Sequence, residues 1–182
     1  MICLAKKLLQ IDKIMRKKAW LWPSLEFMGT DLTGKIIGLI GFGNIGLAMA
    51  HKAGGFGMKI LVYDPHVSAD LATNFHAEFV GLDTLLRTSD VISIHCVLTP
   101  ETEELIRANE LKKIKKTAFI IDVSRGAIIN ENAILTALEE KWIAGAGLDV
   151  FAHEPPKPGS SYLRHGQCNP HPASGLIYQG SL

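Results

Sequence analysis

Short apolar runs alternate with segments of helical spacing through the middle of the chain. The runs predict strands at residues 35–40, 58–63, 78–80, 90–95, 118–123 and 144–149. The segments between them predict helices at 44–56, 82–87 and 131–140. A further helix is expected to start at Thr99-Pro100, because Thr is a good N-cap and Pro suits the first helical position. This alternation is typical of a doubly wound α/β domain, a parallel sheet with helices on both faces, which we expect from about residue 30 to 152.

The first 18 residues predict a basic amphipathic helix. Six of them are Lys or Arg and one is Asp, so this segment carries +5 and the remainder of the chain −4. Its apolar stripe consists of Leu4, Leu8, Ile11 and Met15. Such a helix can lie on a membrane surface, bind nucleic acid or act as a transit peptide. The segment has one Arg and no Ser, whereas transit peptides are rich in both, which argues against a transit peptide. A solvated helix that packs its stripe on the body of the protein is favoured, as is usual for a charged segment of this kind.

Composition narrows the class of protein. The chain has 182 residues, 47% hydrophobic and 20% charged, as in a globular domain, and its net charge of +1 gives no general attraction to nucleic acid. No apolar run reaches the roughly 18 residues of a membrane span. The three cysteines are odd in number, widely spaced and without a CxxC pair. They argue against a disulfide framework or a cysteine zinc site and suit a reducing compartment, so we expect a cytoplasmic protein without a bound metal ion.

A glycine-rich loop provides the first candidate site. Residues 41–46, Gly-Phe-Gly-Asn-Ile-Gly, directly follow a predicted buried strand and open a predicted helix. In such a G-x-G-x-x-G loop the first glycine permits the tight turn, the second lets the backbone approach a pyrophosphate, and the third lets the helix lie close to the strand. The N–H groups at the start of the helix favour phosphate. The residues expected to bind a dinucleotide here are Gly41, Gly43, Asn44, Ile45 and Gly46.

An acidic residue ends the next predicted strand. Asp64 lies 18 residues after Gly46. A carboxylate at this position accepts hydrogen bonds from a ribose hydroxyl and repels a 2′-phosphate, which favours NAD over NADP. The alternative interpretation is a tight turn and an Asp-Pro pair that serve only the fold.

These motifs and several later ones resemble the NAD-binding domain of the D-isomer-specific 2-hydroxyacid dehydrogenases, which include glyoxylate and hydroxypyruvate reductases and phosphoglycerate dehydrogenase. The resemblance covers roughly residues 1–156. It rests on residues 34–46, Leu98-Thr-Pro-Glu-Thr102, Val123-Ser-Arg-Gly126, and Gly147-Leu-Asp-Val-Phe151 with Glu154-Pro155. It implies a Rossmann fold with NAD as cofactor, and it makes the basic leader similar to the family's interdomain helix.

The resemblance also implies the chemistry of a site for a 2-hydroxy or 2-keto acid. Arg125 matches the cation that binds the substrate carboxylate, for which a planar guanidinium is suited. His171, in the segment 169–174, matches the general acid/base, and Glu154 matches the acid that keeps this imidazole protonatable near neutral pH. Ser124 and Asp149 match cofactor-binding positions, Asp149 near the nicotinamide carboxamide.

Some features depart from the family pattern. The interval from Glu154 to His171 is 17 residues, shorter than in close relatives. Val97 stands where relatives have proline, and Asp122-Val123 replaces an Asn-Thr pair. We expect these two changes to alter affinity and not the type of ligand. The other histidines have no comparable context and are assigned no chemistry: His51, His66, His76, His95, His153 and His165.

The family implies a longer protein. Relatives carry an earlier substrate domain of roughly a hundred residues and a C-terminal helix that returns to it. We expect three parts in this chain: a basic linking helix and connector at 1–29, the Rossmann domain at 30–156, and an irregular tail at 157–182. The tail would be the remnant of a substrate domain that is otherwise missing or truncated.

Three functions stay open. The first is an NAD-dependent oxidoreductase of the 2-hydroxyacid dehydrogenase type. The second is a truncated NAD-binding module, dimeric and catalytically weak or inactive, similar to the relatives that act as NAD-sensing transcriptional corepressors. The third is a truncated or mispredicted coding sequence without a role of its own. The expected partners are a small 2-hydroxy or 2-keto acid and a second copy of the chain, and neither nucleic acid nor a membrane.

Overall fold

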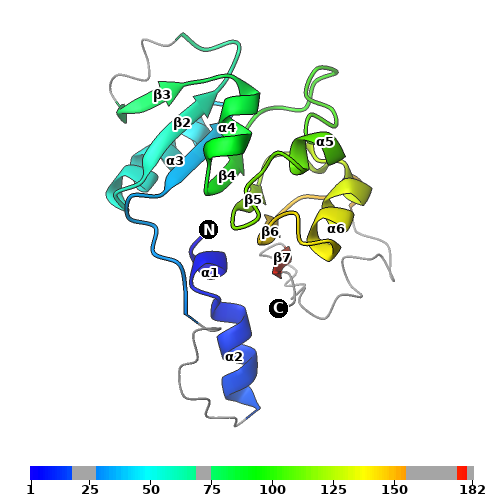
Figure 1. Ribbon diagram of the computed structural model, residues 1–182. Helices are drawn as coiled ribbons and strands as arrows, with labels where there is room; N and C mark the ends of the chain where they lie inside the picture. The colour runs from blue at the N-terminus through cyan, green and yellow to red at the C-terminus, as the bar shows by residue number, and fades with distance from the viewer. Residues whose placement is uncertain (18–27, 69–74, 155–175, 180–182) are drawn as a thin grey trace.

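The computed structural model describes residues 1–17, 28–68, 75–154 and 176–179 (Figure 1). The helices are α1 (Ile2–Ala5), α2 (Leu8–Arg16), α3 (Asn44–Gly55), α4 (Leu82–Thr88), α5 (Ala108–Leu111), the 3-10 helix η3 (Gly126–Ile128) and α6 (Glu131–Glu139). The strands are β1 (Ile36–Ile40), β2 (Lys59–Tyr63), β3 (Ala77–Phe79), β4 (Val91–Ile94), β5 (Phe119–Asp122), β6 (Gly145–Leu148) and β7 (Leu176–Gln179). Every predicted strand is present, with each end within one residue of the prediction.

The strands form one sheet in the order β3-β2-β1-β4-β5-β6-β7. The first six are parallel, and β7 lies antiparallel to β6 at the edge. The chain builds outward from β1 to β3, returns to the other side of β1, and continues from β4 to β6. This is the strand order of dinucleotide-binding folds, and its reversal lies between β1 and β4. The prediction of a doubly wound α/β fold is confirmed.

Helices cover both faces of the sheet, and each face has its own apolar core (Figure 1). Ile37 and Leu39 of β1 belong to the core shared with α1 and α3, whereas Ile40 belongs to the core shared with α4, α5 and α6. The two cores follow from the two-residue period of a strand. Gly38 lets α4 come close, because a Cβ there would lie 2.5 Å from Leu85 Cδ2. Both faces of β1 are therefore buried, as its uninterrupted apolar run predicts.

The basic leader differs from its prediction. It forms two helices, α1 and α2, because Lys7 adopts a left-handed backbone conformation with φ 51°. Leu4 and Ala5 of α1 are buried against the sheet, but Leu8 is 45% and Met15 50% exposed. Figure 1 shows α2 extending away from the sheet. The prediction of one helix that packs its whole stripe on the body was wrong beyond Ala5.

The segment after β4 is a turn and not the helix predicted at Thr99-Pro100. The N–H groups of Thr102 and Glu103 donate to the carbonyl of Thr99 at 3.1 and 2.9 Å, as in a single helical turn. Glu104 then adopts a positive φ of 47°, and its N–H donates to the carbonyl of Ala127 at 2.8 Å. This hydrogen bond to a distant segment ends the turn, so the local capping signal is overridden.

The expected irregular tail contains a strand. β7 pairs antiparallel with β6, for example Ile177 opposite Gly147. Three consecutive apolar residues, Leu176, Ile177 and Tyr178, were too short a run to predict it. Residues 155–175, which include most of the expected tail, lie outside the described residues. Among the helices that the structure describes, none is long and apolar enough to cross a membrane.

Candidate functional site

The glycine loop lies at the switch point of the sheet, between the ends of β1 and β4. Gly41 has φ +93°, and a Cβ there would lie 2.5 Å from the amide nitrogen of Cys96. Gly46 lies against the carbonyl oxygen of Gly41, so that α3 approaches the loop more closely than a side chain would permit. Both positions therefore require glycine for the fold itself.

Gly43 serves a different purpose. Its φ is −74°, an ordinary value, and a Cβ there would meet nothing within 4 Å. It is the N-cap of α3 and, as a glycine, has no side chain with which to cap the helix. The N–H groups of Asn44 and Ile45 begin the first turn and have no partner inside the helix, and both residues are exposed. A diphosphate fits such a surface.

Asp64 ties the end of β2 to the glycine loop. Its Oδ2 accepts a hydrogen bond from the N–H of Phe42 at 2.8 Å, and its Oδ1 accepts one from the N–H of His66 at 2.9 Å. The N–H of Gly41 donates to the carbonyl of Tyr63 at 2.9 Å. The carboxylate thus lies at the turn where the ribose of a bound dinucleotide is expected.

A cavity of about 290 Å³ opens beside these groups. Ile40, Gly41 and Gly43 line it from the end of β1 and the glycine loop. One wall comes from the end of β2, at residues 63–66, and the other from the segment after β4, at residues 95–105. The structure therefore brings Gly41, Gly43 and Asp64 together around one pocket.

Several lining residues were missed by sequence reasoning. His66 and His95, which were assigned no chemistry, both line the pocket, together with Cys96, Thr99, Glu101, Thr102 and Leu105. The missing signal is the strand order: once β4 is known to lie beside β1, ligands are expected at the carboxyl ends of both strands.

Burial controls protonation on the β4 side of the pocket. His95 Nε2 lies 2.9 Å from Ser93 Oγ, whereas its Nδ1 is buried and has no hydrogen-bond partner among the described residues. Burial lowers the pKa of His95, which favours the neutral ring. Burial, followed by the nearby carboxylates of Asp122 and Asp64, raises the pKa of the Cys96 thiol to about 11. Cys96 is therefore a protonated thiol at neutral pH and not a nucleophile.

The second group of predicted residues lies at the ends of β5 and β6. Asp122 ends β5 and is 1% exposed; its Oδ1 accepts hydrogen bonds from the N–H of Ser124 at 2.9 Å and from its hydroxyl at 2.6 Å. The exposed Arg125 follows directly, and its Nη1 donates to the carbonyl of Ser124 at 2.7 Å. Within the described ranges no carboxylate lies within salt-bridge distance of Arg125. The charge of this guanidinium is thus available to an anion.

The segment after β6 packs on the Arg125 loop. Gly126 lies directly against the backbone of Phe151 and Ala152. The N–H of Asp149 donates to the carbonyl of Asp122 at 2.9 Å, and Glu154 Oε1 accepts from the N–H of Phe151 at 3.0 Å. Arg125, Asp149 and Glu154 therefore occupy neighbouring strand ends, outside the lining of the pocket. His171 lies outside the described residues, so its relation to Glu154 stays a prediction.

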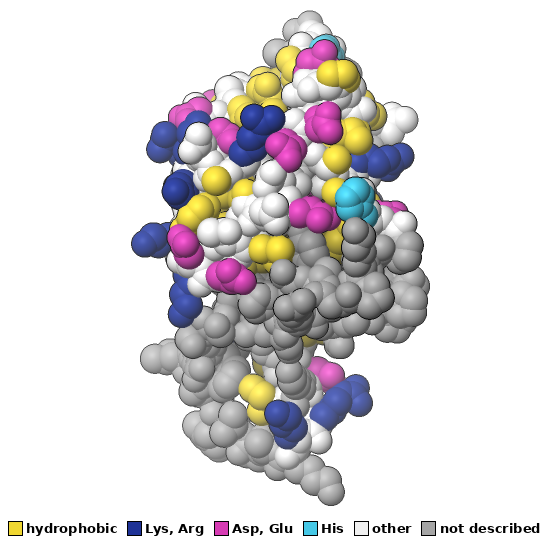
Figure 2. All heavy atoms as spheres, turned by 90° about the vertical axis from the view of Figure 1, so that its right-hand side faces the viewer, with side chains coloured by type: hydrophobic (Ala, Val, Ile, Leu, Met, Phe, Trp, Pro, Cys, Tyr) yellow, Lys and Arg dark blue, Asp and Glu magenta, His cyan; other side chains and the backbone are white. Residues whose placement is uncertain are grey.

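Charged side chains of both signs are mixed on one face of the molecule. Figure 2 shows Lys and Arg interspersed with Asp and Glu on the face that carries α5 and α6. In residues 1–17, 28–68, 75–154 and 176–179, no group of three or more His, Cys, Asp or Glu side chains is placed to hold a metal ion.

We expect Asp122→Asn to change the pH dependence of stability. Burial raises the pKa of Asp122 above its ordinary value, against the lowering effect of the Ser124 hydrogen bonds. The stabilisation of the folded state that follows from this raised pKa is fully present below the ordinary pKa of an aspartate. It is lost as pH rises through the raised pKa of Asp122. The Asn variant does not titrate there, so the Tm of the variant minus that of the wild type should increase between about pH 4 and about pH 7.

Asp90→Asn provides a control of opposite sign. Burial raises the pKa of Asp90, but hydrogen bonds from the Ile36 N–H (2.9 Å) and Lys115 Nζ (3.0 Å) outweigh it and lower the pKa overall. Its stabilisation is present above the ordinary pKa of an aspartate and is lost as pH falls through the lowered one, so the same Tm difference should stay nearly constant from pH 4 to pH 7 and increase below about pH 4. Parallel curves for the two variants would contradict the assignment for Asp122.

Comparison with known proteins identifies the family. Residues 1–173 match the family model for the D-isomer specific 2-hydroxyacid dehydrogenase, NAD binding domain. The glyoxylate reductase of Thermococcus litoralis is 44% identical over 160 residues, which are 85% of this chain and 48% of that protein. The D-3-phosphoglycerate dehydrogenase of Synechocystis is 43% identical over 164 residues, 90% of this chain and 29% of that protein.

Solved structures agree. The D-lactate dehydrogenase of Aquifex aeolicus, complexed with NAD and lactic acid, matches with a TM-score of 0.78 at 33% identity over 82% of this chain and 44% of its own. A glyoxylate reductase from Paecilomyes thermophila matches with a TM-score of 0.78 at 33% identity over 87% of this chain and 48% of its own. The chain spans about half the length of the glyoxylate reductases it matches. The predicted resemblance and the predicted cofactor, NAD, are confirmed: this chain belongs to the D-isomer specific 2-hydroxyacid dehydrogenase family, whose NAD binding domain it contains.

Proposed function

We propose that this chain is the cofactor-binding part of an oxidoreductase that moves a hydride between nicotinamide and a small 2-hydroxy or 2-keto acid. The observation that carries the proposal is the glycine loop at the switch point, with the Asp64 carboxylate 2.8 Å from the Phe42 amide nitrogen. NAD, when bound, supplies the hydride acceptor or donor. The protein contributes binding, orientation and charge.

The cofactor would be held at three places. The backbone of Gly43, Asn44, Ile45 and Gly46 would hold the diphosphate, as the unpaired N–H groups at the start of α3 favour. Asp64 would accept hydrogen bonds from the adenosine ribose. Ser124 and Asp149 would contact the nicotinamide end. Ser124 follows β5, which lies beside β4, and Asp149 follows β6, the next strand of the sheet. Gly41 contributes by shaping the turn.

Arg125 would bind the substrate carboxylate, because its guanidinium is exposed and unpaired by any described acid. Glu154 would support His171 as the general acid/base: a nearby carboxylate favours the protonated imidazole, which can then donate its proton to the keto oxygen. In the reverse direction the neutral imidazole would take the hydroxyl proton.

We infer the division of the chain from the same arrangement. Residues 1–29 would be the linking helix and connector, 30–156 the Rossmann domain, and 157–182 a tail whose strand β7 adds to the edge of the Rossmann sheet. The chain spans about half the length of its glyoxylate reductase relatives, and a catalytically weak or inactive NAD-binding module is the second candidate. In the part of the chain that the structure describes, Cys3 and Cys96 are free, which supports a reducing, cytoplasmic location. A second copy of the chain as partner is proposed from the family resemblance.

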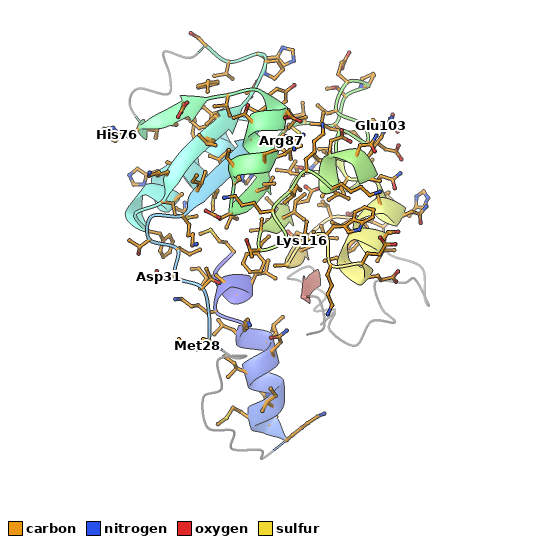
Figure 3. All side chains as sticks on the ribbon, viewed as in Figure 1. Met28, Asp31, His76, Arg87, Glu103 and Lys116 are labelled. Atoms are coloured by element: carbon orange, nitrogen blue, oxygen red, sulfur yellow. The ribbon has the colours of Figure 1, made fainter. Side chains whose placement is uncertain are left out.

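We expect Arg125→Ala to weaken 2-keto acid binding at least about tenfold, the loss typical of a charge-assisted hydrogen bond, while the Kd for NADH stays unchanged. Glyoxylate is titrated into the NADH-saturated full chain, and Arg87→Ala is the control. Arg87 is also an exposed arginine, but it lies on α4 and pairs with Asp83 at 2.7 Å (Figure 3). Equal effects of the two substitutions would contradict the role of Arg125.

A steady-state assay with several 2-keto acids separates the two candidate functions. We expect the full chain to bind NADH and to reduce glyoxylate and hydroxypyruvate far more slowly than an ordinary enzyme rate of about 10 per second. Turnover near that rate would assign the complete oxidoreductase activity to this chain. NADH binding without turnover would support the binding module.

A further inference from the structure

The pocket beside the glycine loop is negatively charged on two opposite walls. Asp64 lines it from the end of β2, and Glu101 lines it from the turn after β4. Among the described lining residues there is no Lys or Arg, and the basic groups are His66 and His95. Since burial favours the neutral form of His95, its ring does not offset the two carboxylates.

The turn that carries Glu101 is fixed by its own hydrogen bonds. Thr102 Oγ1 donates to the carbonyl of Val97 at 2.6 Å and accepts from the N–H of Thr99 at 2.8 Å. The end of the turn is held by the Glu104 N–H, which donates to the Ala127 carbonyl at 2.8 Å. The backbone of Glu101 is therefore held in a defined position, and this position determines where the charged side chain leaves the turn beside the pocket.

Glu101 is ionised at neutral pH. A hydrogen bond from Thr99, then its own backbone N–H and the nearby His66, lower the pKa of its carboxyl group. The side chain is exposed at the mouth of the pocket, so the substitution of Gln for Glu removes the charge without opening a cavity in the core. Its neighbour Glu103 is also exposed and on the same turn but does not line the pocket. Figure 3 shows Glu103 on the side of the turn that faces away from β2 and β3.

We propose that Glu101 is a second selectivity residue, which acts with Asp64 across the pocket to disfavour dinucleotides that carry a 2′-phosphate. The inference rests on the proposed position of the adenosine ribose beside Asp64. A 2′-phosphate carries up to two negative charges, and each carboxylate repels it, whereas a 2′-hydroxyl is neutral. One consequence is that removing Asp64 alone leaves the second carboxylate in place and is insufficient to convert the chain to an NADPH binder.

The test compares Kd values for NADH and NADPH, measured by calorimetry on the full chain at low and at high salt. For Glu101→Gln we expect the affinity for NADPH to rise about three- to tenfold, as befits a charge removed at a solvent-exposed site, and the affinity for NADH to change less than about twofold. Glu101→Lys should raise NADPH affinity further. The gain should shrink at high salt, because screening weakens interactions between exposed charges.

The matched control is Glu103→Gln, which removes the same charge from the same turn outside the pocket. We expect no change in either Kd. The inference is overturned if Glu101→Gln changes the Kd for NADPH no more than this control does, or changes the Kd for NADH by the same factor. Either result would leave the NADH site proposed for the wild-type chain unaffected. A wild-type chain that does not bind NADH would contradict the proposed function as well.

Discussion

The substitution Gly43→Val is expected to abolish NADH binding and to leave the fold intact. The backbone at Gly43 has φ −74° and ψ −167°, which valine adopts without strain, and a Cβ there would meet nothing within 4 Å. That empty space is where we place the diphosphate, whose approach to the backbone requires that no side chain intervene. A branched side chain would separate the diphosphate from the N–H groups of α3. We expect a loss of at least about a hundredfold in affinity, near 3 kcal/mol.

The control is Gly54→Val, in the last turn of the same helix. A Cβ at Gly54 also meets nothing within 4 Å, but this residue lies at the far end of α3 from the loop. Both variants should unfold within a few degrees of the wild type, and NADH should raise the Tm of Gly54→Val and not that of Gly43→Val. If Gly43→Val binds NADH as well as the control does, the diphosphate does not lie at this helix.

The substitution Gly126→Ala is expected to cause the largest loss of stability. A Cβ at Gly126 would overlap the backbone of Phe151 and Ala152, and backbone cannot rotate away as a flexible side chain can. To relieve this overlap, the segment 149–154 must move away from the Arg125 loop; otherwise the backbone remains strained. Overpacking of this kind costs about 3 kcal/mol, which corresponds to a fall in Tm of roughly 6–12 °C in a chain of this length.

Gly55→Ala is the control for this prediction. Gly55 ends α3, and a Cβ there would meet nothing within 4 Å, so Ala should keep or slightly raise the Tm. Thermal unfolding followed by circular dichroism measures both variants. A Gly126→Ala variant as stable as the wild type would show that the two strand ends, and with them Arg125 and Glu154, are not packed together as described.

The elements that the sequence predicted correctly are those with local causes. Because β1 and β4 are buried on both faces, their sequences are short apolar runs that do not alternate with polar residues. Such runs predict strands. The glycines of the loop were recognised because a strand precedes them and a helix follows, and Gly41 and Gly46 indeed lie too close to other backbone for a side chain. Asp64 was expected beside the loop because it ends the next strand, 18 residues after Gly46, and its carboxylate accepts a hydrogen bond from the Phe42 N–H at 2.8 Å.

The features that the sequence did not predict depend on distant contacts. His95 and Glu101 line the pocket only because β4 returns to lie beside β1, and a single strand does not reveal its neighbour. The turn at Thr99 ends early because Glu104 bonds to Ala127, 23 residues further on. Tertiary hydrogen bonds of this kind override local capping preferences.

Cofactor preference is the most direct test of the claim that a dinucleotide lies across the glycine loop with its adenosine ribose at the Asp64 carboxylate. Calorimetric titration of the wild-type chain with NADH and with NADPH, at one ionic strength, measures it. We predict one site per chain, a Kd for NADH of about micromolar order, and NADPH weaker by about tenfold or more. Equal affinities, or no heat of binding with NADH, would contradict the account.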